Sequence, residues 1–297
     1  MNPEVEQESG MSRSTSYQEG VRSSKSWLML RRLIVVVLGI VGWQLVASQV
    51  HSRGLSGSPT VPTIQHLLLQ SLPRVATFTS QTGSSRFPQG WTAIGPALSV
   101  LIVPAFVSSV RVLLGLCAGI AAGIGLGFVV GRVKLAGRLA APLLQGIRII
   151  PFVVLVPLFT LWFGQSSAGV AAFIAMGVFA VMFTTTVTLV AAIPITFEQY
   201  ARTLGASRLR VDWSVVLPWL LRRIRGPLSL AVGIAWTLDI AGELLGVQNG
   251  LGVLMEDSLR FAYTGRMIVL IVVYVILAIT TTTFVSLIVS RLAPSPA

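Results

Sequence analysis

The chain has 297 residues, of which 54% are hydrophobic and 11% charged, whereas a soluble domain carries about 25% charged residues. This composition excludes an ordinary soluble globular protein and predicts an all-α polytopic membrane protein. The net charge of +12 would suit nucleic-acid binding, but the basic residues fall between apolar segments, as expected of loops on the cytoplasmic side of a membrane. We therefore expect the lipid bilayer, and no nucleic acid, as a partner.

The residues needed for the common kinds of catalysis are scarce. The chain has one cysteine, Cys117, and two histidines, His51 and His66, so it can form no intrachain disulfide and offers no metal-binding cluster. It lacks both the phosphate-binding pattern GxxxxGKS/T and the nucleophile pattern GxSxG. We expect a chain that is not an enzyme, holds no metal or cofactor and does not hydrolyse ATP by itself.

The N-terminal third alternates between polar and apolar segments. Residues 1–26 are polar and predict a disordered cytoplasmic tail, and 27–50 contain the first predicted transmembrane helix. Residues 51–104 are rich in Gly, Ser and Pro and predict an extracytoplasmic segment. The apolar run 97–107 begins inside this segment and ends just after it, and it is short for a membrane span. This run suits an interfacial helix or an extension of the second span; if it crossed the membrane, there would be seven spans.

Six spans are predicted in total, each near the ~20 residues that a bilayer requires. The five after the first cover approximately residues 110–130, 149–163, 170–193, 227–247 and 267–289. With both termini inside, 16 Lys and Arg residues fall on the cytoplasmic side and 6 on the outer side, which is the bias that sets orientation. We predict a multi-pass protein of a bacterial inner membrane, with both termini, including a tail at 291–297, in the cytoplasm.

Four glycines in the second span recur at every fourth residue: Gly115, Gly119, Gly123 and Gly127. Residues at this spacing share one face of a helix, and small residues there let another helix approach closely in lipid. The glycine face is either a packing ridge inside the subunit, which we favour, or a seam between two subunits.

The third span contains Pro151 and Pro157. Each proline removes a backbone donor and disturbs a helix, which is tolerated in a membrane where protein or a water-filled cavity satisfies the freed carbonyl. The two prolines therefore indicate either a translocation path or a kinked packing helix.

The fifth span holds two carboxylates, Asp239 and Glu243, one helical turn apart and so on one face. An ionised carboxylate near the bilayer centre costs about 2.5–3.5 kcal/mol, so both should face protein or water. A rise of about 1.5 Å per residue from Pro227 places them in the outer half of the span. They are either a polar lining or gate near the outer mouth of a path, or a buried pair with Arg260 or Arg266.

Residues 196–218 form a polar stretch between the fourth and fifth spans. Thr196 and Gln199 have the spacing of a capping box, and Phe197, Tyr200, Ala201 and Leu204 lie on one apolar helix face. Gly205 suits the left-handed position that ends a helix, and a second short helix can run from Ser207 to Pro218. Helices this short need a partner surface, which is either a groove in another protein or the membrane interface.

This stretch resembles the cytoplasmic signature of binding-protein-dependent ABC importer permeases. That signature is EAA, then G after three residues, I after nine more, and LP after one more. The spacing is matched here by Gly205, Val215, Leu217 and Pro218. The EAA positions are occupied by Gln199-Tyr200-Ala201, with Glu198 one place early. Residues 108–115, 147–164, 201–207 and 235–255 are similar to the nitrate/sulfonate/taurine/bicarbonate-type branch of these permeases. The resemblance covers about residues 105–290.

This resemblance implies a type I ABC importer permease (MetI-like) fold, with a permease core at 105–290 that carries a coupling-helix hairpin at 196–218. It implies a second permease subunit, identical or different, two cytoplasmic ATPase subunits that hold ATP–Mg, and an extracytoplasmic solute-binding protein. The solute would be small and anionic.

The implied ATPase-coupling residues are Phe197, Glu198, Tyr200, Ala201, Arg202, Leu204, Gly205, Ala206, Leu217 and Pro218. The alternative function is a secondary transporter or channel without an ATPase. Such a protein would show inverted repeats with paired broken helices, and no later span matches the proline-broken third span.

Overall fold

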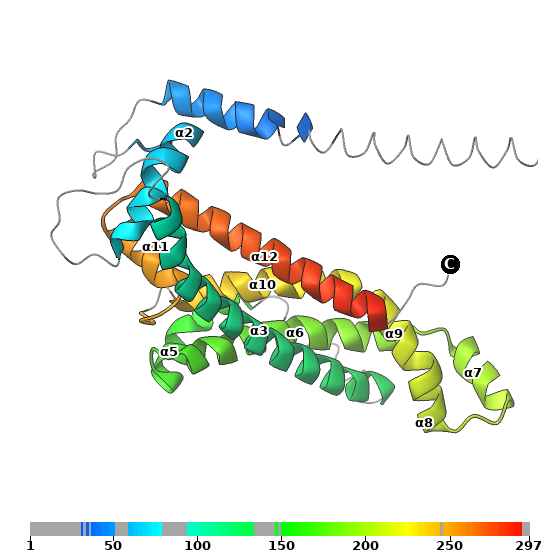
Figure 1. Ribbon diagram of the computed structural model, residues 1–297. Coiled ribbons are helices and arrows are strands. Elements are labelled where there is room, and N and C mark those ends of the chain that lie inside the picture. Colours follow the sequence, from blue (N-terminus) through cyan, green and yellow to red (C-terminus); the bar gives the residue numbers. More distant parts are fainter. Residues whose placement is uncertain are drawn as a thin grey trace, which may run out of the picture.

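A computed structural model describes residues 31, 34–35, 37–50, 59–78, 94–133, 146–147, 150–243 and 246–292. Helices make up its regular elements (Figure 1). The predicted tail at 1–26, residues 293–297, and parts of the predicted extracytoplasmic segment (51–58 and 79–93) lie outside the described residues.

Two long helices form the centre of the subunit, α3 (Ile94–Arg132) and α6 (Ser167–Ala191). Helix α3 includes the apolar run 97–107, so this run is an extension of the second span and not a separate crossing. The proposed boundary between residues 104 and 105 falls inside this helix, next to Pro104. The extension gives α3 39 residues, or about 58 Å at 1.5 Å per residue, which is longer than a bilayer core is thick.

The glycine face of α3 packs against α6 within the subunit. A Cβ atom added at Gly119 would lie 2.6 Å from the carbonyl oxygen of Ala175, and one at Gly123 would lie 2.7 Å from Cβ of Met182. Gly115 and Gly127 are equally close to Ile174 and Thr186. All four glycines are therefore used in the intramolecular packing ridge that the sequence favoured over a subunit seam.

Helix α10 (Arg225–Glu243) packs against both α6 and α12 (Thr264–Leu292). The shared core contains Phe173 and Ile174 of α6, Val232 and Leu238 of α10, and Leu270 of α12. A Cβ atom added at Gly177 would collide with Leu238, so this glycine brings α6 and α10 close together. The four helices run lengthwise through the body in Figure 1.

The predicted third span is a short helix pair, η4 (Phe152–Leu155) followed by α5 (Val156–Phe163). Pro151 immediately precedes η4, and Pro157 lies in the first turn of α5, where a proline lacks no helical hydrogen bond. The two prolines therefore mark the beginnings of helical segments and do not kink a longer helix.

Three helices in the described residues are long and apolar enough to cross a membrane, α3, α6 and α12. A fourth crossing results if the bent pair Arg208–Arg223 and Arg225–Glu243 is taken as one span. Val37–Gln49 and Phe152–Phe163, in the predicted first and third spans, are shorter apolar helices.

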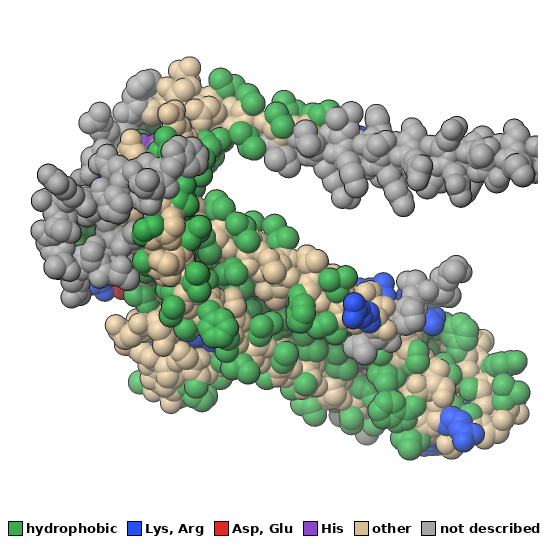
Figure 2. Space-filling model, viewed as in Figure 1, with side chains coloured by type: hydrophobic (Ala, Val, Ile, Leu, Met, Phe, Trp, Pro, Cys, Tyr) green, Lys and Arg blue, Asp and Glu red, His purple; other side chains and the backbone are tan. Residues whose placement is uncertain are grey.

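The remaining elements lie at the two ends of the helical body. At one end, α2 (Ile64–His66), η1 (Leu67–Ser71) and η2 (Pro73–Phe78) pack near the start of α3 and α12, beside α11 (Leu251–Arg260). At the other end lie α7 (Ile195–Thr203) and α8 (Arg208–Val211). Hydrophobic side chains cover much of the side between these ends (Figure 2), as expected of a surface that faces lipid.

Candidate functional site: a helical hairpin and a buried polar centre

The predicted hairpin consists of α7 and α8 joined by a glycine turn. Gly205 has φ +77°, and the N–H of Ala206 donates to the carbonyl of Ala201 at 3.1 Å. A residue with a side chain is strained in this left-handed conformation. Ser207 caps α8 by accepting a hydrogen bond from the backbone N–H of Arg210 at 3.4 Å. The glycine turn and the Ser207 cap are both confirmed.

The start and end of the hairpin differ from the prediction. Helix α7 begins at Ile195 after Pro194, with no side-chain cap, so the capping box of Thr196 and Gln199 is wrong. Pro194 explains the difference, because its ring fixes φ, here at −59°, and sets the helix start two residues earlier than a Thr196 cap would.

At the other end, the chain does not break at Pro218. It continues from α8 through η5 (Asp212–Val216) into α9 (Leu217–Arg223), and bends by 54° before α10. The wider π-helical turn of η5 precedes Pro218, which lies in the first turn of α9. A widened turn accommodates the ring and the missing N–H of a proline without ending the helical path.

The hairpin has an exposed apolar side and an inner side. Phe197, Tyr200 and Leu204 are 52%, 69% and 72% exposed. Ala201 and Ala206, by contrast, are partly buried against the core. The predicted apolar face is therefore divided: the small residues attach the hairpin to the subunit and the large ones point away from it.

Two further large side chains extend this exposed surface, Leu209 of α8 and Trp213 of η5, which are 69% and 67% exposed. The sequence analysis missed both, because it assigned the apolar face to the first helix alone. Their spacing of four residues was the available signal. We call Phe197, Tyr200, Leu204, Leu209 and Trp213 the hairpin surface.

An arginine at the end of α3 joins the two parts of the hairpin. One terminal nitrogen of Arg132 binds Glu198 of α7, and the other lies 2.7 Å from Oδ1 of Asp212 in η5. Glu198 also lies 3.9 Å from Arg202, one turn along α7. The second span was predicted to end near residue 130, whereas α3 extends to Arg132.

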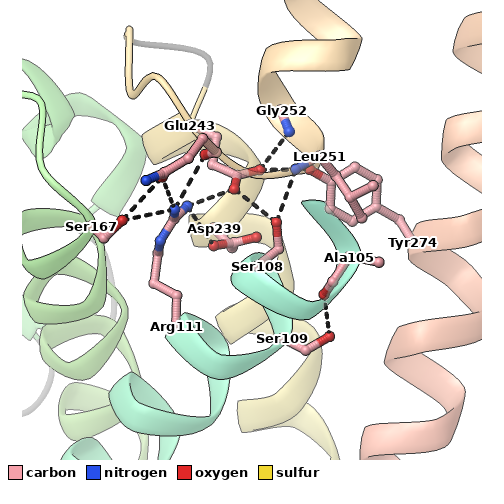
Figure 3. A network of polar contacts seen from close by, with 11 residues as sticks. Ala105, Ser108, Ser109, Arg111, Ser167, Asp239, Glu243, Leu251, Gly252 and Tyr274 are labelled. Carbon is pink, nitrogen blue, oxygen red and sulfur yellow. Dashed lines mark hydrogen bonds and ion pairs between the residues drawn. The ribbon is translucent and has the colours of Figure 1, made fainter. Parts of the chain in front are cut away.

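A second arginine of α3, Arg111, organises a polar centre at the other end of the body (Figure 3). Its Nη1 atom lies 2.5 Å from Oε1 of Glu243 and 3.5 Å from Oδ1 of Asp239. Its Nη2 atom donates to Oδ1 of Asn249 at 2.7 Å and to Ser167 at 3.1 Å. The Asp239 and Glu243 side chains are 0% exposed and that of Arg111 is 2% exposed.

Glu243 accepts hydrogen bonds from three more groups, which come from three different segments. The donors are the hydroxyls of Ser108 and Tyr274, each at 2.8 Å, and the backbone N–H of Gly252 at 2.6 Å. A side chain at Gly250 or Gly252 would occupy the space of this carboxylate. The polar centre therefore connects α3, α6, α10, the 249–252 segment and α12 (Figure 3).

The partners considered for the two carboxylates were wrong. Arg260 pairs with Glu256 at 2.7 Å and Arg266 with Asp257 at 3.6 Å. Arg111 was missed as a partner because the second span was predicted to begin near residue 110, which placed Arg111 at the outer end of that span. In the structure Arg111 lies in the interior of α3, one turn after Ser108. Pro151 and Pro157 are exposed whereas the carboxylates are buried, so the four predicted path residues do not share one surface here.

Comparison with known proteins identifies the class of protein. Residues 115–295 match the profile of the family described as "Binding-protein-dependent transport system inner membrane component". Since this match covers more than half of the chain, the chain belongs to that family. It includes the glycine ridge from Gly115 onward, the hairpin, and Asp239 and Glu243.

Named relatives agree with this assignment. The chain is 28% identical over 171 residues to the taurine transport system permease protein TauC of Escherichia coli, which is 58% of this chain and 62% of TauC. It is 26% identical over 191 residues to the nitrate import permease protein NrtB of Synechococcus elongatus, which is 64% of this chain and 67% of NrtB. The chain thus covers less than two thirds of TauC.

The fold is that of a type I importer permease. A chain from inward-facing conformations of the MetNI methionine ABC transporter superimposes with a TM-score of 0.52 at 18% identity, covering 66% of this chain and 97% of that chain. This similarity supports the arrangement of helices predicted from the signature residues.

Proposed function

We propose that the chain is the membrane-spanning permease subunit of an ATP-driven ABC importer, and that a separate cytoplasmic ATPase subunit binds the hairpin surface. The carrying observation is the exposure of Phe197, Tyr200 and Leu204 on a hairpin whose Gly205 to Pro218 spacing matches the family signature. Phe197 and Tyr200 lie on the nine-residue helix α7 and Leu204 is its C-cap, an arrangement that suits the anchors of a helix-in-groove contact.

The complete importer would contain two permease subunits, identical or different, two ATPase subunits that hold ATP–Mg, and an extracytoplasmic solute-binding protein. Both termini would lie in the cytoplasm of a bacterium, with the chain in the inner membrane. In support, 16 of the 22 Lys and Arg residues fall on that side, and basic side chains are visible at the hairpin end of the body in Figure 2.

The transported solute would be a small anion. The relatives TauC and NrtB are named for taurine and nitrate transport, and the chain carries no Asp or Glu from residue 51 to residue 111. Among the four path candidates, Pro151 and Pro157 are exposed and remain the candidates for contact with such a solute. Asp239 and Glu243 are buried with Arg111 in the polar centre, which favours a structural role for them.

Charge introduced into the hairpin surface tests this proposal. Leu204→Asp and Tyr200→Asp should abolish co-purification of the ATPase subunit encoded with this chain, because a carboxylate would be buried in an apolar groove. Leu259→Asp is the matched control, since Leu259 is also exposed, at 58%, but lies on α11 at the opposite end. Its variant should retain the ATPase.

The proposal fails if both hairpin variants bind the ATPase as the unchanged protein does. The alternative, a secondary transporter or channel, predicts a different result. Proteoliposomes that contain only this chain would then take up solute along an ion gradient, without ATP and without any ATPase subunit.

A further inference from the structure

Helix α7 has few attachments to the rest of the subunit. None of its nine residues is buried, and only Ala192, Ile193 and Pro194 connect it to α6. A helix of this length is marginal in water unless something holds it. Its orientation must therefore be set by contacts outside the helix.

Arg132 provides such a contact from a fixed position. A Cβ atom added at the preceding residue, Gly131, would lie 2.9 Å from Cβ of Val190 in α6, so α3 and α6 are in close contact up to this residue. Arg132 is the last residue of α3. Its side chain therefore projects from the rigid end of the α3–α6 pair.

The guanidinium group of Arg132 binds two carboxylates with two different nitrogens. Nη1 binds Glu198 of α7 and Nη2 binds Asp212 of η5. The contact with Glu198 is a hydrogen bond and the contact with Asp212 an ion pair. A planar guanidinium group holds its two terminal nitrogens in a fixed relation, which the single nitrogen of a lysine ammonium cannot do. Since Gly205 lies between these two partners in the chain, Arg132 holds both arms of the hairpin.

We propose that Arg132 is a positioning residue that fixes the hairpin relative to the α3–α6 pair and transmits hairpin movement to these helices. The identity of the moving partner, the ATPase, rests on the function proposed above. The Arg132 contacts themselves do not depend on it. Glu198 is thus used within the subunit, while Gln199, at the first EAA position, is exposed.

The first test uses the purified full-length chain without an ATPase. Amide hydrogen exchange is followed in peptides from 195–211 for Arg132→Gln and for the control Arg202→Gln, which removes only the 3.9 Å pair with Glu198. Arg132→Gln should speed exchange in α7 by about fivefold, as expected from losing two partly exposed ion pairs. The control should change it by less than about twofold.

Two further variants keep the proposal falsifiable. Glu198→Gln combined with Asp212→Asn removes the same pairs from the other side and should reproduce the faster exchange. Arg132→Lys keeps the charge but loses the fork, and should give an intermediate rate. Unchanged exchange in both Arg132→Gln and the double variant would overturn the proposal.

The second test uses the assembled importer and separates this inference from the proposed function. Arg132→Gln should still bind the ATPase, because the hairpin surface is intact, but should transport severalfold less solute per ATP hydrolysed. Normal transport per ATP would contradict the transmission of movement. If instead the unchanged chain binds no ATPase, the proposed function fails while the exchange experiment still decides whether Arg132 positions the hairpin.

Discussion

Two arginines of α3 carry the same chemical arrangement in different environments, Arg111 in the interior of the helix and Arg132 at its last residue. Each binds two carboxylates: Arg111 binds Asp239 and Glu243, and Arg132 binds Glu198 and Asp212. The side chains around Arg111 are 0–2% exposed, whereas those around Arg132 are 19–23% exposed. The two arginines are 21 positions apart in the sequence, or about 31 Å along the helix, close to the thickness of a bilayer core.

This difference in burial separates an anchor from an adjustable contact. Removing one partner of a buried pair leaves an uncompensated charge and costs about 3–5 kcal/mol. A solvent-exposed pair contributes only about 0–1 kcal/mol, so it can break and form again as the hairpin moves. We infer that Arg111 holds α3 and α10 firmly together, whereas Arg132 holds the hairpin to the end of α3 by contacts that can break and form again.

The largest effect on stability is expected at Arg111. Arg111→Leu should lower the free energy of unfolding by about 3–5 kcal/mol, because Glu243 would remain buried among Ser108, Tyr274 and Gly252 without its counter-charge. Thermal unfolding of the detergent-purified chain measures this change. Arg260→Gln is the control, since its partner Glu256 is one turn away on the exposed side of α11, and it should cost less than about 0.5 kcal/mol. Equal melting temperatures for the two variants would mean that the buried Arg111 contacts stabilise the subunit no more than an exposed ion pair does.

The next largest effect on stability is expected at the glycine ridge, which lies between Arg111 and Arg132. Gly119→Ala places a methyl group 2.6 Å from the carbonyl oxygen of Ala175, and overpacking of this kind costs about 1–3 kcal/mol. Gly125→Ala, on the same helix, meets nothing within 4 Å and should be neutral or slightly stabilising. Thermal unfolding compares the two variants. If Gly119→Ala were as stable as Gly125→Ala, α3 and α6 would not be the tightly packed pair that makes the Arg132 end of α3 rigid.

The sequence predicted the features that depend on local pattern. These are the helical fold class, the glycine ridge, the left-handed Gly205 and the Ser207 cap, each encoded by residues within one or two helical turns. It could not predict which arginine meets Asp239 and Glu243, because Arg111 lies 132 residues before Glu243 in the chain. The pairing depends on how α3 and α10 pack, and an early prediction of α3 that began near residue 110 placed Arg111 at a helix end.

The errors at Thr196 and Pro218 have a similar origin. The residues Thr196 and Gln199 fit a capping box, but Pro194 had already set the start of α7. Pro218 was expected to separate two helices, but the π-helical turn of η5 lets the chain continue to Arg223. In both places a neighbouring backbone feature overrode a correct side-chain preference.

A smaller effect is expected from the backbone of the hairpin itself. Gly205→Ala should destabilise the turn by about 1–2 kcal/mol, because φ is +77° there and a Cβ atom is strained in this conformation. The cost comes from the backbone alone, since a Cβ at this position meets nothing within 4 Å. Gly205→Asn is the control, because asparagine tolerates the left-handed region better. Amide exchange in 195–211 should be faster in the alanine variant than in the asparagine variant, and equal rates would contradict this.

The smallest expected effect is that of salt on amide exchange, which distinguishes the Arg132 contacts from the Arg111 contacts without a mutation. Salt screens charges that reach water and has little influence on buried pairs, since the Debye length is about 30 Å at 0.01 M and about 3 Å at 1 M ionic strength. Raising salt over this range should increase amide exchange in the Arg132-bound residues 195–211 by less than about threefold. Exchange in residues 239–243, beside Arg111, should not change. The Arg132→Gln variant provides the control, because its hairpin should have lost most of its dependence on salt. A dependence of the same size in both segments would mean that the polar centre is accessible to ions, and that burial does not anchor α3 at Arg111.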